Sequence, residues 1–246
     1  MKFKSNLNNV QMIMSKHILL IAAVLLSGML NGQTKTQEKA NPKRTINENI
    51  EWTNSWVVAN DKHDLTKVLV IGDSHVNAYY PVLVEFLKDK AYVSKFTTSK
   101  SLGDPVYIEQ LKWFLKSNKF EIISINNGLH GIGFTLDQYA GDLPVVYKII
   151  RKYQPAAKLI WVNTTARRIA NRTSEFDSLN RQVIERNKVV SAFCNEKQIP
   201  LLDLYILSAE HPGYFQSDGI HFQPEGVNEE AKRLQNLILQ ALLQIK

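Results

Sequence analysis

The chain has 246 residues, 44% of them hydrophobic and 22% charged, with a formal net charge of +7 at pH 7. Those fractions exclude a disordered chain and are typical of one globular domain with its own core. The Lys and Arg residues form no basic block, which argues against a nucleic-acid partner. The single cysteine, Cys194, excludes an intramolecular disulfide, and its helical surroundings predict a buried thiol.

Residues 1–32 have the pattern of a secretory signal peptide. Lys16 and His17 precede an unbroken apolar run over residues 18–26, and small residues follow that run. The run is shorter than the roughly 20 apolar residues that span a bilayer, although an uncleaved membrane anchor is the alternative. We expect the mature protein to be secreted or periplasmic and to keep no stable membrane span.

This segment affects two expectations: which methionine starts the chain, and what net charge the mature protein carries. Residues 1–11 are polar and resemble no targeting element, so Met12 or Met14 would make a more ordinary start. Removal of residues 1–32 takes away three basic residues and no acidic one, which lowers the net charge from +7 to +4. The working protein is therefore expected to be only mildly basic.

The remainder of the chain divides into a short lead-in and one domain. Residues 33–49 are polar and are expected to form a flexible lead-in, and residues 50–246 to form the domain. From residue 67 onward, short apolar runs alternate with longer amphipathic segments. The predicted strands cover residues 67–71, 91–96, 120–125, 158–162 and 199–204, and the predicted helices cover residues 76–90, 105–116, 136–153, 175–197 and 224–245.

This alternation predicts an α/β protein built as a three-layer α/β/α sandwich around a five-stranded parallel sheet. In such open sheets, sites form at the carboxyl ends of the strands. Every chemically suggestive segment follows a predicted strand, so all of them are expected at one sheet edge. These segments are Gly72-Asp73-Ser74-His75, residues 101–104, residues 126–131, residues 164–172 and Ser217-Asp218-Gly219-Ile220-His221.

The segment Gly72-Asp73-Ser74-His75 lies between the first predicted strand and the first predicted helix. A glycine allows a sharp turn there, and the helix start offers backbone N–H groups to a developing negative charge. This is the setting that a nucleophilic serine requires. We expect Asp73 to stabilise the turn and His75 to line the mouth of the site or to pack at the helix start.

Asp218 and His221 supply the partners that such a serine needs. A carboxylate three residues before a histidine can hold one ring nitrogen while the other nitrogen faces a hydroxyl. Together, Ser74, Asp218 and His221 resemble the SGNH (GDSL-like) hydrolase family over residues 67–242. The resemblance implies a flavodoxin-like sheet, with Ser74 as nucleophile, His221 as general base and Asp218 as its orienting carboxylate.

The same resemblance implies an oxyanion hole made by the N–H of Ser74, a loop glycine that Gly103 matches, and an Asn side chain after the third strand. The family's Gly-x-Asn-Asp appears here as Gly128-Leu129-His130-Gly131. His130 takes the Asn place in strict register, and a ring N–H can serve as the donor. Asn127 is the alternative donor, with His130 then behind it.

The sequence therefore predicts a serine esterase that hydrolyses acyl esters, with O-acetyl groups on carbohydrate as the suggested substrate. No cofactor and no metal are expected; the partner is a small-molecule or polysaccharide ester. The alternatives are an acyltransferase that uses the same triad and a non-catalytic carbohydrate-binding protein on the same scaffold. Three arginines in the loop after the fourth strand could bind an acidic or hydroxyl-rich substrate: Arg167, Arg168 and Arg172.

Overall fold

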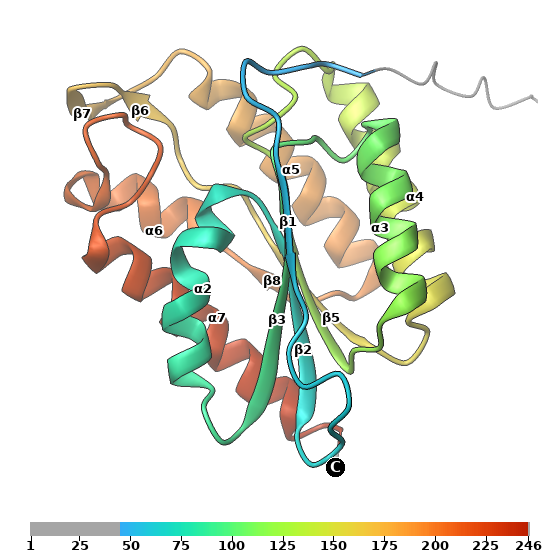
Figure 1. The fold of residues 1–246 in the computed structure, drawn as a ribbon. Coiled ribbons are helices and arrows are strands. Elements are labelled where there is room, and N and C mark those ends of the chain that lie inside the picture. Colours follow the sequence, from blue (N-terminus) through green and yellow to red (C-terminus); the bar gives the residue numbers. More distant parts are fainter. Residues whose placement is uncertain (1–44, 246) are drawn as a thin grey trace, which may run out of the picture. The chain divides into compact units, whose positions relative to one another are not determined.

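The computed structural model describes residues 45–245, so the predicted signal peptide and most of the predicted lead-in lie outside the described residues. The described chain alternates strands and helices (Figure 1). Its strands are β1 (Thr53–Trp56), β2 (Thr66–Gly72), β3 (Ala91–Thr98), β4 (Ile122–Asn126), β5 (Lys158–Val162), β6 (Arg168–Ile169), β7 (Arg172–Phe176) and β8 (Leu201–Leu202). Its helices are α2 (Ser74–Phe86), α3 (Pro105–Ser117), α4 (Leu136–Tyr153), α5 (Asn180–Lys197), α6 (Leu204–Glu210), the 3₁₀ turn η1 (Pro212–Tyr214) and α7 (Pro224–Leu242).

The central sheet has the strand order β1-β3-β2-β4-β5-β8. The five strands from β3 to β8 are parallel, which confirms the predicted sheet, and in chain order they run 2-1-3-4-5, the flavodoxin-like arrangement. β1 adds a sixth, antiparallel strand on the outer side of β3, which the sequence patterns did not predict. All four residues of β1 are exposed, so the strand has no apolar periodicity that could reveal it.

Helices cover both faces of this sheet, as the alternation predicts (Figure 1). On one face, α3, α4 and α5 pack against strand residues such as Leu69 and Ile71. On the other face, α2, α6 and α7 pack against Val68 and Val70. Alternate residues of β2 therefore enter opposite cores, which explains why the strand reads as one unbroken apolar run. Cys194 is buried in the first core, and burial raises the pKa of its thiol to about 12.

The helix predicted over residues 76–90 runs from Ser74 to Phe86, and two predicted elements on the carboxyl-terminal side of β5 differ from the structure as well. The helix predicted from residue 175 begins at Asn180, because residues 172–176 pair with residues 168–169 as the hairpin β6–β7. The strand predicted over residues 199–204 is only β8, because Asp203 caps α6 by accepting a hydrogen bond from the Ile206 N–H. The hairpin and α6 both lie beside the carboxyl end of the sheet (Figure 1).

The topology fixes where a site can form. β2 lies between β3 and β4, so the chain leaves β2 toward one side and later returns on its other side. Such a switch in strand order opens a crevice at the carboxyl end of the strand, and Ser74 lies there. None of the helices within residues 45–245 is long and apolar enough to cross a bilayer.

Candidate active site

The turn between β2 and α2 presents Ser74 as the first residue of the helix. Asp73 caps this helix: its Oδ1 accepts a hydrogen bond from the His75 N–H at 3.0 Å. A Cβ at Gly72 would lie 2.3 Å from Val76 Cγ2, so only glycine fits the tight turn. The Ser74 N–H belongs to the first helical turn, whose N–H groups have no partner within the helix.

The loop before α7 is folded around the carboxylate of Asp218. Its Oδ1 accepts from the N–H of Ile220 at 2.8 Å and from the N–H of His221 at 2.9 Å. Its Oδ2 receives the Nδ1–H of the His221 ring at 2.6 Å. One carboxylate therefore fixes both the backbone and the ring of His221.

Gly219 is required at the centre of this loop. Its φ of +73° is rare for other residues, and a Cβ there would lie 2.2 Å from the carbonyl oxygen of Arg168. The Arg168 N–H donates to the carbonyl of Gly219 at 2.8 Å, so β6 holds the loop directly. The hairpin that the sequence patterns missed is therefore part of the support of the site.

Ser74, His221 and Asp218 form a continuous chain of hydrogen bonds. The Ser74 Oγ lies 2.9 Å from His221 Nε2, on the opposite side of the ring from Asp218. Because an ionised carboxylate only accepts, His221 Nδ1 carries the proton and Nε2 is free to accept from the serine hydroxyl. Ser74 and His221 are 147 residues apart in the sequence. In the structure they meet, together with Asp218, through the predicted contacts.

The loop also sets the charge on Asp218. Burial alone would raise the pKa of this carboxyl, but hydrogen bonds from the His221 ring and from the N–H groups of Ile220 and His221 outweigh it. The pKa of Asp218 is therefore lowered, and the group stays ionised at neutral pH. An ionised Asp218 stabilises the imidazolium that would form when His221 accepts a proton.

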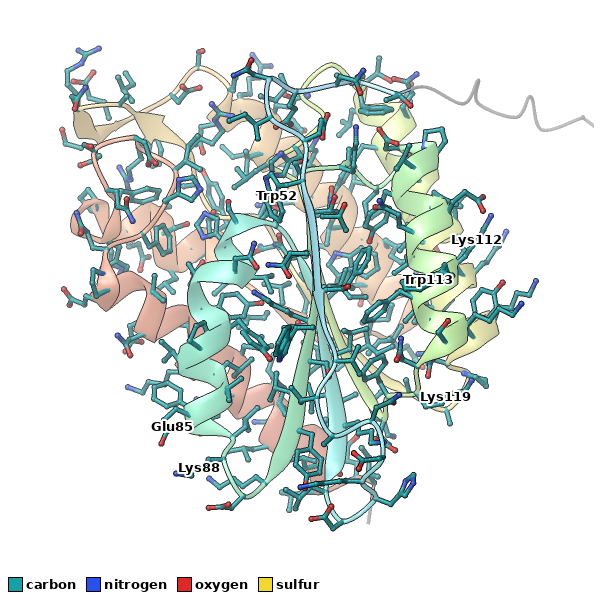
Figure 2. The ribbon with its side chains drawn as sticks, viewed as in Figure 1. Trp52, Glu85, Lys88, Lys112, Trp113 and Lys119 are labelled. Carbon is teal, nitrogen blue, oxygen red and sulfur yellow. The ribbon has the colours of Figure 1, made fainter. Side chains whose placement is uncertain are left out.

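Ser74 and His221 open onto one pocket of about 510 Å³, a size that suits a small ligand. Trp52, from the segment before β1, lies at the carboxyl-end edge of the sheet, whereas Trp113 projects from the outside of α3 (Figure 2). The pocket combines apolar walls with a few charged groups. Its lining is Ile46, Glu48, Asn49, Trp52, Ser74, Leu129, His130, Ile132, Gly133, Arg167, Ile220 and His221.

Comparisons with known proteins find this arrangement of strands and helices among solved structures. A carbohydrate esterase family 3 protein from Talaromyces cellulolyticus is 12% identical, with a TM-score of 0.59 over 74% of this chain and 100% of that chain. An acetyl xylan esterase is 14% identical, with a TM-score of 0.60 over 70% of this chain and 99% of that one. A GDSL-like lipase from Bacteroides thetaiotaomicron is 15% identical, with a TM-score of 0.55 over 74% and 89%.

The chain has the SGNH-hydrolase fold. No protein-family model and no curated protein matches the sequence. At these identities the similarity lies in the arrangement of strands and helices.

Within this SGNH fold, two of the predicted oxyanion donors do not reach the pocket. The amide of Asn127 is buried and holds the backbone of the loop after β3: Nδ2 donates to the Lys100 carbonyl and Oδ1 accepts from the Leu102 N–H. Gly103 packs against α4, where an added Cβ would lie 2.0 Å from the carboxylate of Asp142. The described lining of the pocket contains neither residue, so an oxyanion role for Gly103 or Asn127 stays a prediction.

His130 is the predicted donor that does line the pocket with Ser74. Its Nδ1 lies 2.9 Å from a carboxylate oxygen of Glu48. With Nδ1–H donated to Glu48, the neutral ring has only a lone pair at Nε2, so Nε2 can donate only from the imidazolium.

Only one of the three candidate arginines reaches the pocket. Arg167 lines it, its buried Nε has no hydrogen-bond partner within the described residues, and its nearest carboxylate oxygen, on Asp177, is 3.8 Å away. Arg168 is buried and donates to the carbonyls of Ser208 and Ala209. Arg172 is exposed and pairs with Glu175.

The sequence patterns missed Glu230 and left two places open for His75. His75 packs, buried, at the start of α2, which is the second of its two predicted places, and its Nδ1 lies 3.0 Å from a carboxylate oxygen of the fully buried Glu230. The signal for Glu230 was available: it is the one carboxylate on the apolar face of α7, between Val227 and Ala231. Across residues 45–245, no group of three or more His, Cys, Asp or Glu side chains could hold a metal ion.

Proposed function

We propose that this protein is a serine esterase that hydrolyses acyl esters with Ser74 as its nucleophile. The observation that carries the proposal is the unbroken chain from Ser74 Oγ through the His221 ring to Asp218, at 2.9 Å and 2.6 Å. The similarity to solved esterases supports it at the level of fold. A protein that only bound carbohydrate would have no use for this chain of hydrogen bonds.

In the first half of the reaction, His221 Nε2 takes the proton of Ser74 as Oγ attacks the ester carbonyl. The tetrahedral oxyanion accepts from the Ser74 N–H at the start of α2 and from the His130 ring. His221 then gives its proton to the leaving alcohol, and an acyl ester on Ser74 remains. Asp218 stays ionised throughout and stabilises the imidazolium.

In the second half, His221 accepts a proton from water as the water attacks the acyl ester. The second tetrahedral intermediate collapses when His221 returns the proton to Ser74 Oγ, and the carboxylic acid leaves. A sugar hydroxyl in the place of this water would give acyl transfer by the same residues. The structural neighbours named as an acetyl xylan esterase and a carbohydrate esterase favour water as the acceptor, so hydrolysis is the reaction we propose.

For the substrate, we propose O-acetyl groups on carbohydrate. The indole of Trp52 and the charged side chains of Glu48 and Arg167 line the same pocket as Ser74. An aromatic face beside polar groups suits a sugar ring, whose C–H face is apolar and whose edge carries hydroxyl groups. Two structural neighbours named an acetyl xylan esterase and a carbohydrate esterase support this choice.

We also propose that the protein acts outside the cytoplasm, in the periplasm or after secretion. The proposal rests on the apolar run over residues 18–26 with its basic flank, because the structure describes residues 45–245 alone. A polysaccharide substrate is consistent with that location.

Kinetics with the serine replaced test the proposed function. Ser74→Ala removes the nucleophile and leaves His221, Asp218 and the pocket in place. We expect kcat on p-nitrophenyl acetate to fall by at least about 10³-fold with the fold unchanged by circular dichroism. A Ser74→Ala protein with full esterase activity would refute the proposal.

A further inference from the structure

Behind the proposed triad lies a second buried pair of ionisable side chains, His75 on α2 and Glu230 on α7. Their side chains are 7% and 0% exposed, and His75 Nδ1 lies 3.0 Å from Glu230 Oε1. Taking two charged groups out of water is costly, and well-packed apolar residues at such positions are often equally stable. The pair therefore calls for an explanation beyond holding α2 against α7.

The other nitrogen of the His75 ring points to the loop that carries His221. His75 Nε2 lies 3.1 Å from the carbonyl oxygen of Ile220, the residue directly before His221. The rings of His75 and His221 stack with centroids 6.0 Å apart and planes inclined by 23°. The ring of Phe222, directly after His221, meets His75 edge-on at 4.9 Å.

The hydrogen-bond pattern indicates which atoms of His75 and Glu230 carry protons. A carboxylate and a carbonyl both accept, so a ring placed between them must carry a proton on each nitrogen or share one with Glu230. Burial would lower the pKa of His75, but the charge and hydrogen bond of Glu230, the charge of Asp73 and the Ile220 carbonyl raise it to about 9. At neutral pH His75 therefore donates from both nitrogens.

We propose that His75 and Glu230 form a positioning pair for the general base. Glu230 fixes the His75 ring through Nδ1, and Nε2–H of that ring fixes the Ile220 carbonyl. The Ile220–His221 peptide is thereby held from the side opposite to Asp218, which fixes the N–H groups of the same two residues. Within residues 45–245, the side chains of His75 and Glu230 make no hydrogen bond to Ser74 and do not line the pocket that opens beside it; they act through the position of His221.

Two anchors on one short loop matter because proton transfer depends on geometry. Asp218 holds the ring through the loop itself, so Asp218 and His221 can move together as one unit. The bond from His75 ties that unit to α2, the helix whose first residue is Ser74. A displacement of about 1 Å between a base and its nucleophile can cost roughly 10²-fold in rate.

The inference rests on the proposed function. Its test measures the turnover of p-nitrophenyl acetate per active site. The number of active sites is the fraction of the protein that a fluorophosphonate labels. For His75→Leu and Glu230→Leu we expect kcat to fall by about 10- to 100-fold with KM within about twofold. Glu230→Gln should keep most of kcat, because its amide N–H can donate to Nδ1 of a neutral His75 that still donates from Nε2.

A matched control separates positioning from loosened packing. Gln235→Leu removes a hydrogen bond of 2.8 Å from α7 to the Phe86 carbonyl of α2, at the far end of the same two helices. It should lower the melting temperature without changing kcat. If the two leucine variants lose no more kcat than Gln235→Leu does, or if only their KM rises, the positioning role is refuted.

A second readout keeps this test separate from that of the proposed function. Backbone hydrogen exchange over residues 216–222 should become faster in His75→Leu and Glu230→Leu but not in Gln235→Leu, whether or not the protein turns over an ester. Unchanged exchange with a wild type that does hydrolyse esters would overturn the inference alone. A wild type that neither labels nor turns over would overturn the proposed function, with the exchange result still deciding whether His75 holds the loop.

Discussion

At the scale of single residues, the site depends on which side-chain atoms remain free. Asn127 has the right chemistry for an oxyanion donor, yet its amide already makes hydrogen bonds to the backbone of Lys100 and Leu102. His130 has a less usual side chain for the role, but it lines the pocket. Competing hydrogen bonds, which no sequence motif encodes, therefore decide which of these side chains remains free.

His130 and Glu48 give a prediction at this scale. Because the His130 ring lines the pocket and its Nδ1 lies 2.9 Å from a carboxylate oxygen of Glu48, His130→Ala should lower kcat by about 10²-fold, and Glu48→Gln, which weakens the contact that orients the ring, by a smaller factor. KM for a small ester should change little in either variant. Steady-state kinetics on p-nitrophenyl acetate measure both effects.

His63→Ala is the matched control, because His63 is exposed in the loop that leads into the amino end of β2. It should be as active as the wild type. Full activity in His130→Ala would remove this residue from the mechanism.

At the scale of elements, the loop before α7 works because neighbouring segments hold it. The hairpin β6–β7 contacts Gly219 through its backbone, and α2 reaches Ile220 through His75. The loop after β5 supplies both the hairpin and Arg167. The hairpin has little apolar periodicity, and His75 is a single polar residue at the start of α2, so the sequence patterns placed the triad without showing what keeps it in place.

Gly219→Ala tests the hairpin support. The substituted residue would combine a φ of +73° with a Cβ 2.2 Å from the Arg168 carbonyl, so the loop must shift. We expect a loss of about 1–3 kcal/mol in unfolding free energy and at least a tenfold loss of kcat. Urea unfolding and ester kinetics measure the two effects.

Gly213→Ala serves as its comparison, since a Cβ at Gly213 meets nothing within 4 Å. That variant should match the wild type in both stability and rate. An equal effect of the two substitutions would show that the geometry at Gly219 is not special.

Arg167 gives a prediction about substrate charge. Its guanidinium lines the pocket with an unpartnered buried Nε, so it should favour esters whose sugar carries a carboxylate. Arg167→Gln should lower kcat/KM for acetylated methyl glucuronide by about tenfold and change it little for acetylated methyl glucoside. Arg172→Gln, at an exposed arginine outside the pocket, should change neither. Equal losses on both sugars would contradict a role in charge recognition.

At the scale of the whole molecule, the alternation of apolar runs and amphipathic segments was sufficient to predict the three layers and the five parallel strands. It also brought Ser74, Asp218 and His221 to one edge, because the carboxyl ends of parallel strands meet there. It missed β1, whose residues are all exposed, and it left His130 and Asn127 as alternative oxyanion donors, because the choice depends on loop packing. Glu230 was missed as well, although a carboxylate on the apolar face of α7 marks it.

The buried pair makes the stability of the whole molecule depend on pH. The pKa of His75 is about 9 in the folded protein against an ordinary value near 6.5, so its contribution is complete below pH 6.5 and is lost as the pH rises through 9. The groups that face His75 are Glu230 on α7, Asp73 at the start of α2 and His221 in the loop. Unfolding free energy in urea should therefore fall by up to about 3 kcal/mol between pH 6.5 and pH 9.5.

Glu230→Gln removes the charge that raises the pKa of His75, so its unfolding free energy should be nearly flat over that range. Parallel pH profiles of the two proteins would contradict a charged His75.

Covalent labelling by a fluorophosphonate tests the central claim most directly, because the reagent reacts only with an activated serine. We predict one adduct per chain, located by mass spectrometry on Ser74, and at least about 10²-fold slower labelling when His221 is replaced by alanine. No adduct on Ser74, or labelling that is unchanged by loss of His221, would contradict the account.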